Sequence, residues 1–219
     1  MEVIMDIAKR KGLIVIEDAA QALGATLKMS DGSVKSAGSF GLVGCFSLYW
    51  AKVLGGWGNN GMAVTNDAEI ARKIKLMRFN GEDREDRKFY YHGHNFLMDN
   101  LQAALLSIKL KYLPQWLARR KEIAEQYHQG LENIPQVKIP RFEDPRFDDI
   151  YTNYVIRAER RDELKKYLEE KGVETLISWP TPMYKQPLLM PNDIYLPETE
   201  KICREVISLP MYPELTDEQ

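Results

Sequence analysis

The sequence is poor in cysteine and histidine and carries almost no net charge. Its 219 residues include two cysteines and three histidines, and 30 basic residues face 32 acidic ones, a formal net charge of −2. Without a basic excess nothing attracts nucleic acid or a membrane surface, and we expect neither as a partner. Cys45 and Cys203 lie far apart in apolar surroundings, which is typical of free thiols in a reducing compartment.

Long hydrophobic runs are also missing. No stretch is long enough to cross a bilayer, and the first twelve residues mix acidic, basic and apolar side chains, unlike a signal peptide. CxxC and zinc-ligand spacings do not occur, and His92 and His94 lack a third ligand, so we expect no metal site. With 44% hydrophobic residues, the composition indicates a cytoplasmic globular protein of one domain or two small ones.

The chain opens with the pattern of an α/β protein. Apolar residues at helical spacing predict a helix over 2–11, and the continuous apolar run 13–16 predicts a strand covered on both faces, as in a parallel sheet. Ligands of open α/β sheets bind beyond the carboxyl ends of strands, which places Glu17, Asp18 and Gln21 at the expected site edge. Asp18 as a simple helix cap is the alternative.

Further along, the pattern predicts two layers of structure. Asp67 is the expected cap of a helix. After Pro135 the pattern changes from long helices to short alternating strands and helices, which suggests a domain boundary. We expect a large domain over 1–134, including a connecting helix, and a small domain over 135–219. The expected elements are a hairpin or loop within 26–41, strands over 45–50 and 62–65, helices over 67–79, 99–113 and 114–133, then strands over 137–139 and 151–158, a loop over 140–149, and helices over 161–171 and 198–207.

One stretch, residues 44–65, carries the strongest chemical signal. A run of β-forming residues delivers Lys52 into a turn that is rich in glycine, and a second strand follows. A lysine amine attacks an aldehyde only in its neutral form, which burial or a neighbouring cation favours, whereas a solvated lysine in a surface turn stays inert. Both interpretations of Lys52 are open on this stretch alone.

Three residues together suggest a cofactor. Pyridoxal phosphate needs a lysine to carry its aldehyde, a carboxylate to keep its pyridine nitrogen protonated, and hydroxyl donors for its phosphate. Lys52, Asp18 and Ser47 supply one candidate for each requirement. Because these residue types are abundant, the triple is only suggestive by itself.

Five longer segments add to this signal. They are VIEDAAQALGA (15–25), GSFGLVGCFSLYWAKVLGG (38–56), GGWGNNGMAVTND (55–67), HNFLMDNLQAALLSIKL (94–110) and SLPMYPELTDEQ (208–219). Together they resemble the DegT/DnrJ/EryC1/StrS family of sugar aminotransferases, over nearly the whole chain and in the right order. The resemblance implies the fold type I architecture: a partial, mixed, mostly parallel sheet with flanking helices, plus a smaller α+β C-terminal domain.

The resemblance implies a role for each site residue. Lys52 would form the Schiff base with pyridoxal 5'-phosphate, Asp18 would hold the pyridine nitrogen, and Ser47 would donate to the phosphate. Gln21 would lie on the side of the ring oxygen, and Asn95 would reach the phosphate of the other subunit in a homodimer.

The implied reaction is transamination of a nucleotide-linked keto-deoxy sugar, with an amino donor such as glutamate. Trp179 and Tyr184 stand where family members face the sugar. The diphosphate of such a sugar needs cationic side chains, and the sequence does not decide between the candidates Lys185, Arg78, Arg84 and Arg87.

The resemblance also predicts a fragment, without the first part of the large domain and the extreme C-terminus. The alternative functions are therefore a truncated, noncatalytic remnant or an interaction subunit of the same fold. A dehydratase is a lesser variant, because those family members carry histidine in place of Lys52. A generic nucleotide-binding domain is weak, since no GxGxxG or GK[ST] motif opens a helix.

Overall fold

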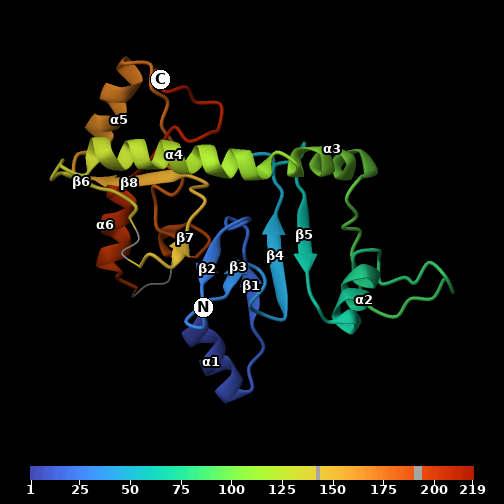
Figure 1. The fold of residues 1–219 in the computed structure, drawn as a ribbon. Coiled ribbons are helices and arrows are strands. Elements are labelled where there is room, and N and C mark those ends of the chain that lie inside the picture. The colour runs from blue at the N-terminus through green and yellow to red at the C-terminus, as the bar shows by residue number, and fades with distance from the viewer. Residues whose placement is uncertain (142–143, 190–193) are drawn as a thin grey trace. The chain divides into compact units, whose positions relative to one another are not determined.

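The computed structural model describes residues 1–141, 144–189 and 194–219, which form two compact units (Figure 1). The first unit comprises residues 1–117 and 144–150, and the second comprises residues 118–143 and 151–219. The helices are α1 (Glu2–Lys11), α2 (Ala68–Met77), α3 (Asn100–Leu110), α4 (Leu113–Leu131), α5 (Arg161–Glu170) and α6 (Pro197–Glu205), with a 3-10 turn η1 (Met183–Lys185). The strands are β1 (Ile16–Asp18), β2 (Thr26–Lys28), β3 (Val34–Ser36), β4 (Val43–Ser47), β5 (Gly61–Val64), β6 (Val137–Lys138), β7 (Phe147–Asp148), β8 (Tyr154–Ala158) and β9 (Val206–Leu209).

The main sheet of the first unit has the strand order β1-β4-β5. β1 runs parallel to β4, with Asp18 opposite Cys45, and β5 is antiparallel to β4, with Gly61 opposite Ser47. A second, antiparallel sheet has the order β3-β2-β7. The mixed sheet with its helices confirms the expected α/β class of a fold type I large domain, and β1–β4 is its parallel pair among the described strands.

The edge of β1 departs from the sequence prediction. The strand begins at Ile16 rather than at residue 13, and it is not covered on both faces. Leu13, Ile14 and Ile16 are 62%, 72% and 65% exposed. Leu13 and Ile14 precede the strand in a stretch without regular structure, and no described element covers the side chains of these three residues.

Two helix ends form as their residues predict. α1 stops at Gly12, which adopts the left-handed conformation (φ 63°) that glycine tolerates without a steric penalty. α2 begins after Asp67, whose carboxylate accepts hydrogen bonds from the N–H groups of Glu69 and Ile70. These bonds satisfy two of the N–H groups that every helix leaves free at its start.

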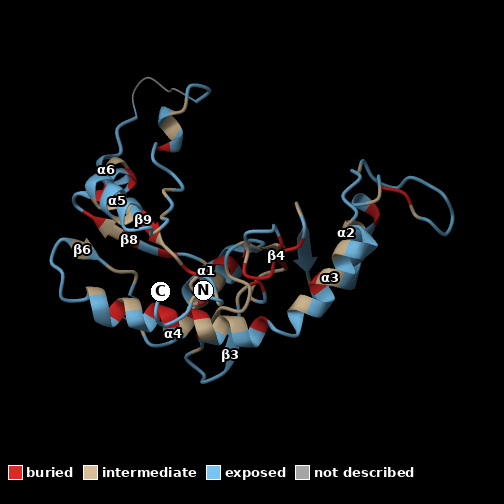
Figure 2. Ribbon diagram, turned by 90° about the horizontal axis from the view of Figure 1, so that it is seen from above, coloured by how far each residue is buried: buried red, intermediate tan, exposed pale blue. Residues whose placement is uncertain are grey.

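The core of the first unit lies beneath the turn that carries Lys52. Val53 and Leu54 are buried against Leu106 of α3, together with Leu48, Leu113 and Ile150. Figure 2 shows buried residues in β4, which leads into this turn, and in α3. The lysine turn is therefore attached to a hydrophobic cluster by the two residues that follow the lysine.

The second unit is the smaller α+β element that the sequence predicts. Its antiparallel sheet has the order β6-β8-β9, and its core joins Tyr154, Ile156 and Ile207 to Ile123 and Ala124 of α4. Because these α4 residues belong to the second core, the compact units divide inside α4, whereas the domain boundary at 134/135 stays a prediction.

One strand lies in a segment expected to be a loop. In the predicted loop over 140–149, Phe147 and Asp148 form β7, which pairs antiparallel with β2. Residues 142–143 of that loop lie outside the described residues. The pairing joins segments about 120 positions apart, so no local pattern announces it.

Tyr154 provides a test of the second core. Its side chain is fully buried, its hydroxyl has no hydrogen-bond partner among the described residues, and burial raises its pKa. A buried, unpaired polar group costs stability, so Tyr154→Phe is expected to raise the free energy of unfolding by about 1 kcal/mol in urea denaturation.

Tyr127 is the matched control in the same core, with ring centroids 4.8 Å apart. Its hydroxyl donates to the carbonyl oxygen of Pro210 at 2.9 Å, so Tyr127→Phe should instead lower the free energy of unfolding by about 1 kcal/mol. A loss of stability in Tyr154→Phe would mean that this hydroxyl is satisfied by bound water.

Candidate active site

Asp18 and Ser47 lie on the same face of the main sheet. Asp18 is the last residue of β1 and stands opposite Cys45 in the parallel register, and Ser47 follows Cys45 by two residues at the end of β4. Side chains two residues apart on a strand point to the same face. A carboxylate and a hydroxyl thus meet at the carboxyl ends of two neighbouring parallel strands, the place where open α/β sheets bind ligands.

One of the two carboxylate oxygens of Asp18 accepts a hydrogen bond from the protein. Its Oδ1 accepts a hydrogen bond from the N–H of Ala20 at 3.0 Å, which shapes the turn after β1. No donor to Oδ2 is found in the described parts of the chain, and the residue is exposed. The alternative interpretation, a helix cap, is wrong, because a turn rather than a helix follows Asp18.

Lys52 lies in the tight turn after β4. Its N–H donates to the carbonyl oxygen of Tyr49 at 2.8 Å, and the N–H of Gly56 closes the turn on the carbonyl oxygen of Leu48 at 2.9 Å. A Cβ at position 55 would come within 2.3 Å of the Trp50 carbonyl oxygen, so this reversal requires Gly55. The Lys52 side chain is half-buried and pairs with no carboxylate in the described parts of the chain.

Residues of α3 hold the far side of this turn, and the sequence analysis missed them. Gln102 accepts a hydrogen bond from the N–H of Trp57 at 2.8 Å and donates to its carbonyl oxygen at 2.7 Å. The ammonium group of Lys109 donates to the carbonyl oxygen of Gly55. Gln102 and Lys109 lie 45 and 54 positions from their partners, and no local motif links such distant residues.

The other expected cofactor residues are placed in loops. Gln21 lies in the turn after β1, close in sequence to Asp18. Asn95 is exposed and forms an isolated antiparallel bridge with Phe79, which fixes the base of the loop between α2 and α3. Phe89, Tyr90 and Phe96 in and after this loop are 69%, 48% and 73% exposed.

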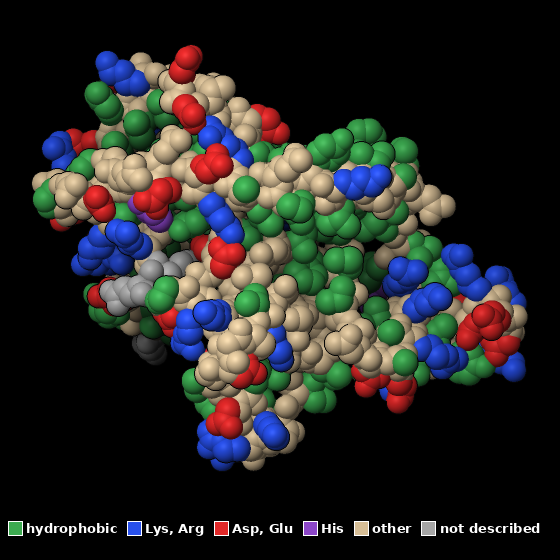
Figure 3. Space-filling view, viewed as in Figure 1, with side chains coloured by type: hydrophobic (Ala, Val, Ile, Leu, Met, Phe, Trp, Pro, Cys, Tyr) green, Lys and Arg blue, Asp and Glu red, His purple; other side chains and the backbone are tan. Residues whose placement is uncertain are grey.

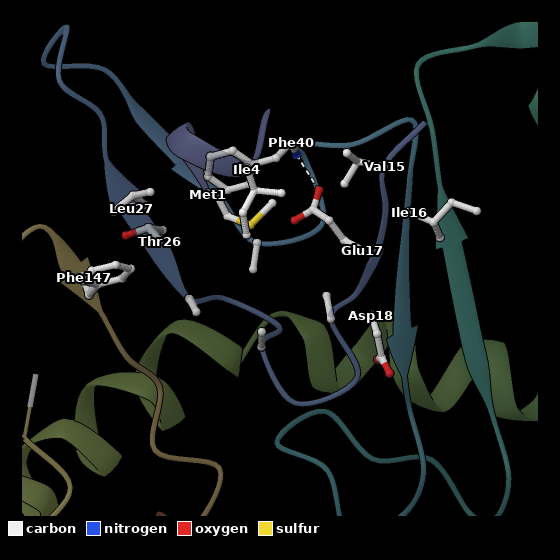
Figure 4. A pocket seen from close by; sticks show the side chains of 14 residues that line it. Met1, Ile4, Val15, Ile16, Glu17, Asp18, Thr26, Leu27, Phe40 and Phe147 are labelled. Carbon is white, nitrogen blue, oxygen red and sulfur yellow. Dashed lines mark hydrogen bonds between the residues drawn. The ribbon is translucent and has the colours of Figure 1, made fainter. Parts of the chain in front are cut away.

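Glu17 faces away from this site. Its carboxylate accepts three backbone hydrogen bonds, from the N–H groups of Gly38, Phe40 and Gly41 at 2.9, 2.6 and 2.7 Å. In Figure 4 it points toward Phe40, while Asp18 points away from the cavity that Glu17 and Phe40 line. That cavity, of about 430 Å³, touches Asp18 but is lined by neither Ser47 nor Lys52. Glu17 therefore anchors the loop before β4.

The two expected substrate residues belong to the second unit. Trp179 is 66% exposed. The hydroxyl of Tyr184 donates to Oε1 of Glu200 at 2.6 Å, and the ammonium group of Lys185 pairs with the same oxygen at 2.8 Å. These hydrogen bonds, that of Lys185 first, hold the pKa of Glu200 below its ordinary value of 4.5.

The lowered pKa of Glu200 predicts a loss of stability in acid. Stability from a carboxylate with a depressed folded-state pKa is complete above the unfolded pKa and disappears as pH falls through the folded value. We therefore expect the melting temperature of the chain to exceed that of Glu200→Gln at pH 7, with the gap closing as pH falls below 4.5. A gap that is constant from pH 7 to pH 3 would contradict this ion cluster.

The four candidate cations for a diphosphate differ in whether another side chain already pairs with them. Lys185 pairs with Glu200, Arg87 pairs with Glu82 at 3.0 Å, and Arg84 lies 3.8 Å above the Phe79 ring. Within the described residues no carboxylate pairs with Arg78. Figure 3 shows both signs of charge on the surface around α2 and the loop that follows it. The same residues contain no cluster of three metal-ligating side chains, and no helix long and apolar enough to cross a membrane.

The mixed sheet and its helices have the fold of the fold type I aminotransferases, because solved aminotransferases share this structure. S. venezuelae DesV, crystallised with a ketimine intermediate, matches with a TM-score of 0.90 and 36% identity over 100% of this chain and 58% of that one. A DegT DnrJ EryC1 StrS aminotransferase from Brucella abortus gives a TM-score of 0.87 at 34% identity, over 98% of this chain and 56% of its own.

The chain belongs to the DegT/DnrJ/EryC1/StrS aminotransferase family, which matches residues 1–219. It is 40% identical to a pleiotropic regulatory protein of Geobacillus stearothermophilus over 100% of this chain and 58% of the relative. It is 37% identical to a dTDP-3-amino-3,4,6-trideoxy-alpha-D-glucose transaminase of Streptomyces venezuelae over 98% of this chain and 56% of the relative. The chain thus spans somewhat more than half the length of these relatives.

Proposed function

We propose that this chain carries the cofactor lysine of a pyridoxal-phosphate-dependent aminotransferase that acts on a nucleotide-linked keto sugar. The observation behind the proposal is the shared face of Asp18 and Ser47 at adjoining strand ends, followed directly by Lys52 in its turn. Several relatives are named as transaminases of dTDP-linked or UDP-linked sugars, which supports this substrate class.

The donor set fits pyridoxal phosphate. Asp18 keeps Oδ2 without a protein donor in the described residues, as the partner of a protonated ring nitrogen requires. Ser47 offers a hydroxyl on the same face, and Lys52 offers an amine without a carboxylate partner there. When bound, the group supplies an aldehyde that exchanges between amines and a ring that withdraws electrons.

The residues of the chain then divide the work. Asp18 would hold a proton on the ring nitrogen, Ser47 would orient the phosphate, and the amine of Lys52 would hold the aldehyde end of the group. Nζ of Lys52, when free, would act as a general base that takes the proton from Cα of an amino donor such as glutamate. In the net reaction the amino donor would become its keto acid and the keto sugar would become an amino sugar, so that amino group and carbonyl oxygen change places.

The proposal extends to the assembly. A homodimer would bring Asn95, on its exposed bridge, to the phosphate of the other subunit, and Gln21 would contact the ring beside Asp18. Trp179 and Tyr184 would contact the sugar.

The experiment is cofactor capture by the 219-residue chain. Pyridoxal phosphate condenses with an amine with loss of water, and borohydride makes the attachment permanent by adding hydride. We expect a visible absorption band on mixing, and peptide mapping after reduction should find the label on Lys52 in preference to the other lysines. Subsequent addition of glutamate to the unreduced sample should remove the band as the amino group is transferred.

The result separates the enzyme from the noncatalytic alternative. Labelling spread evenly over exposed lysines, or no band at all, would contradict the proposal and favour a remnant or interaction subunit of the same fold. Exposed lysines on α1, such as Lys9 and Lys11, serve as internal references for nonspecific reaction in the same digest.

A further inference from the structure

The side chain of Gln102 acts as a substitute peptide group for the lysine turn. It accepts from the N–H of Trp57 at 2.8 Å and donates to the carbonyl oxygen of the same residue at 2.7 Å, the pairing that a neighbouring strand would provide. Trp57 itself is 68% exposed, so its side chain contributes little to holding the turn. The contact is close, since a Cβ at position 56 would lie 3.0 Å from the Gln102 oxygen and 2.8 Å from the amide nitrogen of Asn60.

Lys109 secures the same turn from the next part of α3. Its ammonium group donates to the carbonyl oxygen of Gly55, a buried residue, and lies 5.8 Å from the centre of the Trp116 ring. A charged donor makes a stronger hydrogen bond than a neutral one. The carbonyl group of Gly55 is three residues beyond Lys52, so this contact fixes the chain close to the amine.

These two contacts come from one face of one helix. Gln102, Leu106 and Lys109 are spaced by four and three residues and therefore project from the same side of α3. Leu106 packs in the core that contains Val53 and Leu54. Three successive turns of α3 thus hold residues 53–57 by an apolar contact flanked by two polar ones.

The turn needs such support. It contains glycines at positions 55, 56 and 58, and glycine loses more conformational freedom on ordering than any other residue. Trp50 before the turn and Trp57 at its end are 62% and 68% exposed, so neither side chain anchors the turn in the core. Backbone hydrogen bonds to Leu48 and Tyr49 close the near side of the turn, and α3 supplies the far side.

We infer that Gln102 and Lys109 are positioning residues, which hold the turn so that the Lys52 amine meets the aldehyde of the cofactor. The inference rests on the proposed function of Lys52. It gives α3 a part in the reaction beyond its part in the core. The polar contacts of Gln102 and Lys109 determine where the Lys52 amine lies, and the apolar contact of Leu106 stabilises the folded turn.

The test compares Gln102→Met and Lys109→Met with Gln115→Met and Lys111→Met. The two controls make the same chemical changes at exposed positions outside the turn. Without cofactor, amide hydrogen exchange over residues 53–58 should accelerate by about tenfold in each α3 variant and stay unchanged in the controls. With pyridoxal phosphate and borohydride, labelling of Lys52 relative to Lys9 should fall by about tenfold in the variants.

Rescue separates positioning from stability. Lys109→Arg keeps a charged donor and should restore both the exchange rate and most of the labelling, whereas a lysine that merely fills space would be replaced equally well by methionine. Thermal unfolding of all variants identifies any general loss of fold. Slow exchange and full Lys52 labelling in Gln102→Met and Lys109→Met would overturn the inference while leaving the proposed function intact. A parent chain that is not labelled at Lys52 would instead refute the proposed function, and the assignment to α3 with it.

Discussion

Replacing Lys52 with alanine is expected to abolish specific cofactor capture and to lower the rate of transamination by at least about 10⁴-fold. Under the proposed function, the variant would lose both the amine that attaches the cofactor and the base that moves the Cα proton, and a positioned general base alone contributes roughly 10² to 10⁴ in rate. The measurements are the visible band, the labelled peptide after borohydride, and single-turnover conversion of glutamate to its keto acid.

Two further variants make this result specific. Lys52→Arg keeps the positive charge and the length of the side chain but cannot attach to the aldehyde at neutral pH, so it should be as inactive as Lys52→Ala. Lys9→Ala, at an exposed position on α1, should retain the band and the Lys52 label. A Lys52→Ala chain that keeps the band and turns over glutamate would exclude Lys52 as the cofactor lysine.

The local elements of the fold could be predicted because single residues determine them. The end of α1 at Gly12 depends on a left-handed conformation that glycine favours, and the start of α2 depends on the Asp67 carboxylate. In both cases the partners are within a few positions in the sequence. Strand pairing is different. β7 pairs with β2, which is far away in the sequence, and neither short strand has a pattern from which its partner could be predicted.

Burial was harder to predict than secondary structure. The apolar run 13–16 has the composition of a strand covered on both faces, but Leu13, Ile14 and Ile16 are exposed because no described element packs over them. Composition reports what a segment can bury. Whether it is buried depends on which neighbours the fold provides.

The candidate site shows the same division between near and distant contacts. Asp18, Ser47 and Lys52 could be proposed from the sequence, since each stands at a strand end or in a glycine turn and the family resemblance implies a role for each; these roles stay predictions. Glu17 was expected beside them, yet strand alternation turns it to the opposite face, where it holds three backbone N–H groups. Gln102 and Lys109 were missed because their partners, Trp57 and Gly55, lie far away in the sequence.

Asp18→Asn is expected to slow transamination by roughly 10² to 10³-fold while the fold stays intact. The amide keeps an oxygen that can accept the Ala20 N–H, as Oδ1 of Asp18 does at 3.0 Å, so the turn after β1 should survive. It carries no charge, however, and cannot hold a proton on the ring nitrogen. Losing one fixed electrostatic contact to a developing charge typically costs a factor of this size.

Asp31 offers a control with the same local geometry. Its Oδ1 also accepts from an N–H two residues ahead, that of Ser33 at 2.9 Å, but it lies between β2 and β3 and not at the end of β1. Asp31→Asn should therefore leave Lys52 labelling and the single-turnover rate unchanged. In Asp18→Asn, by contrast, labelling should persist while the rate falls, because under the proposed function attachment needs only the amine of Lys52, whereas the carboxylate of Asp18 keeps the ring nitrogen protonated. Equal rates in the two variants would show that Asp18 only shapes its turn.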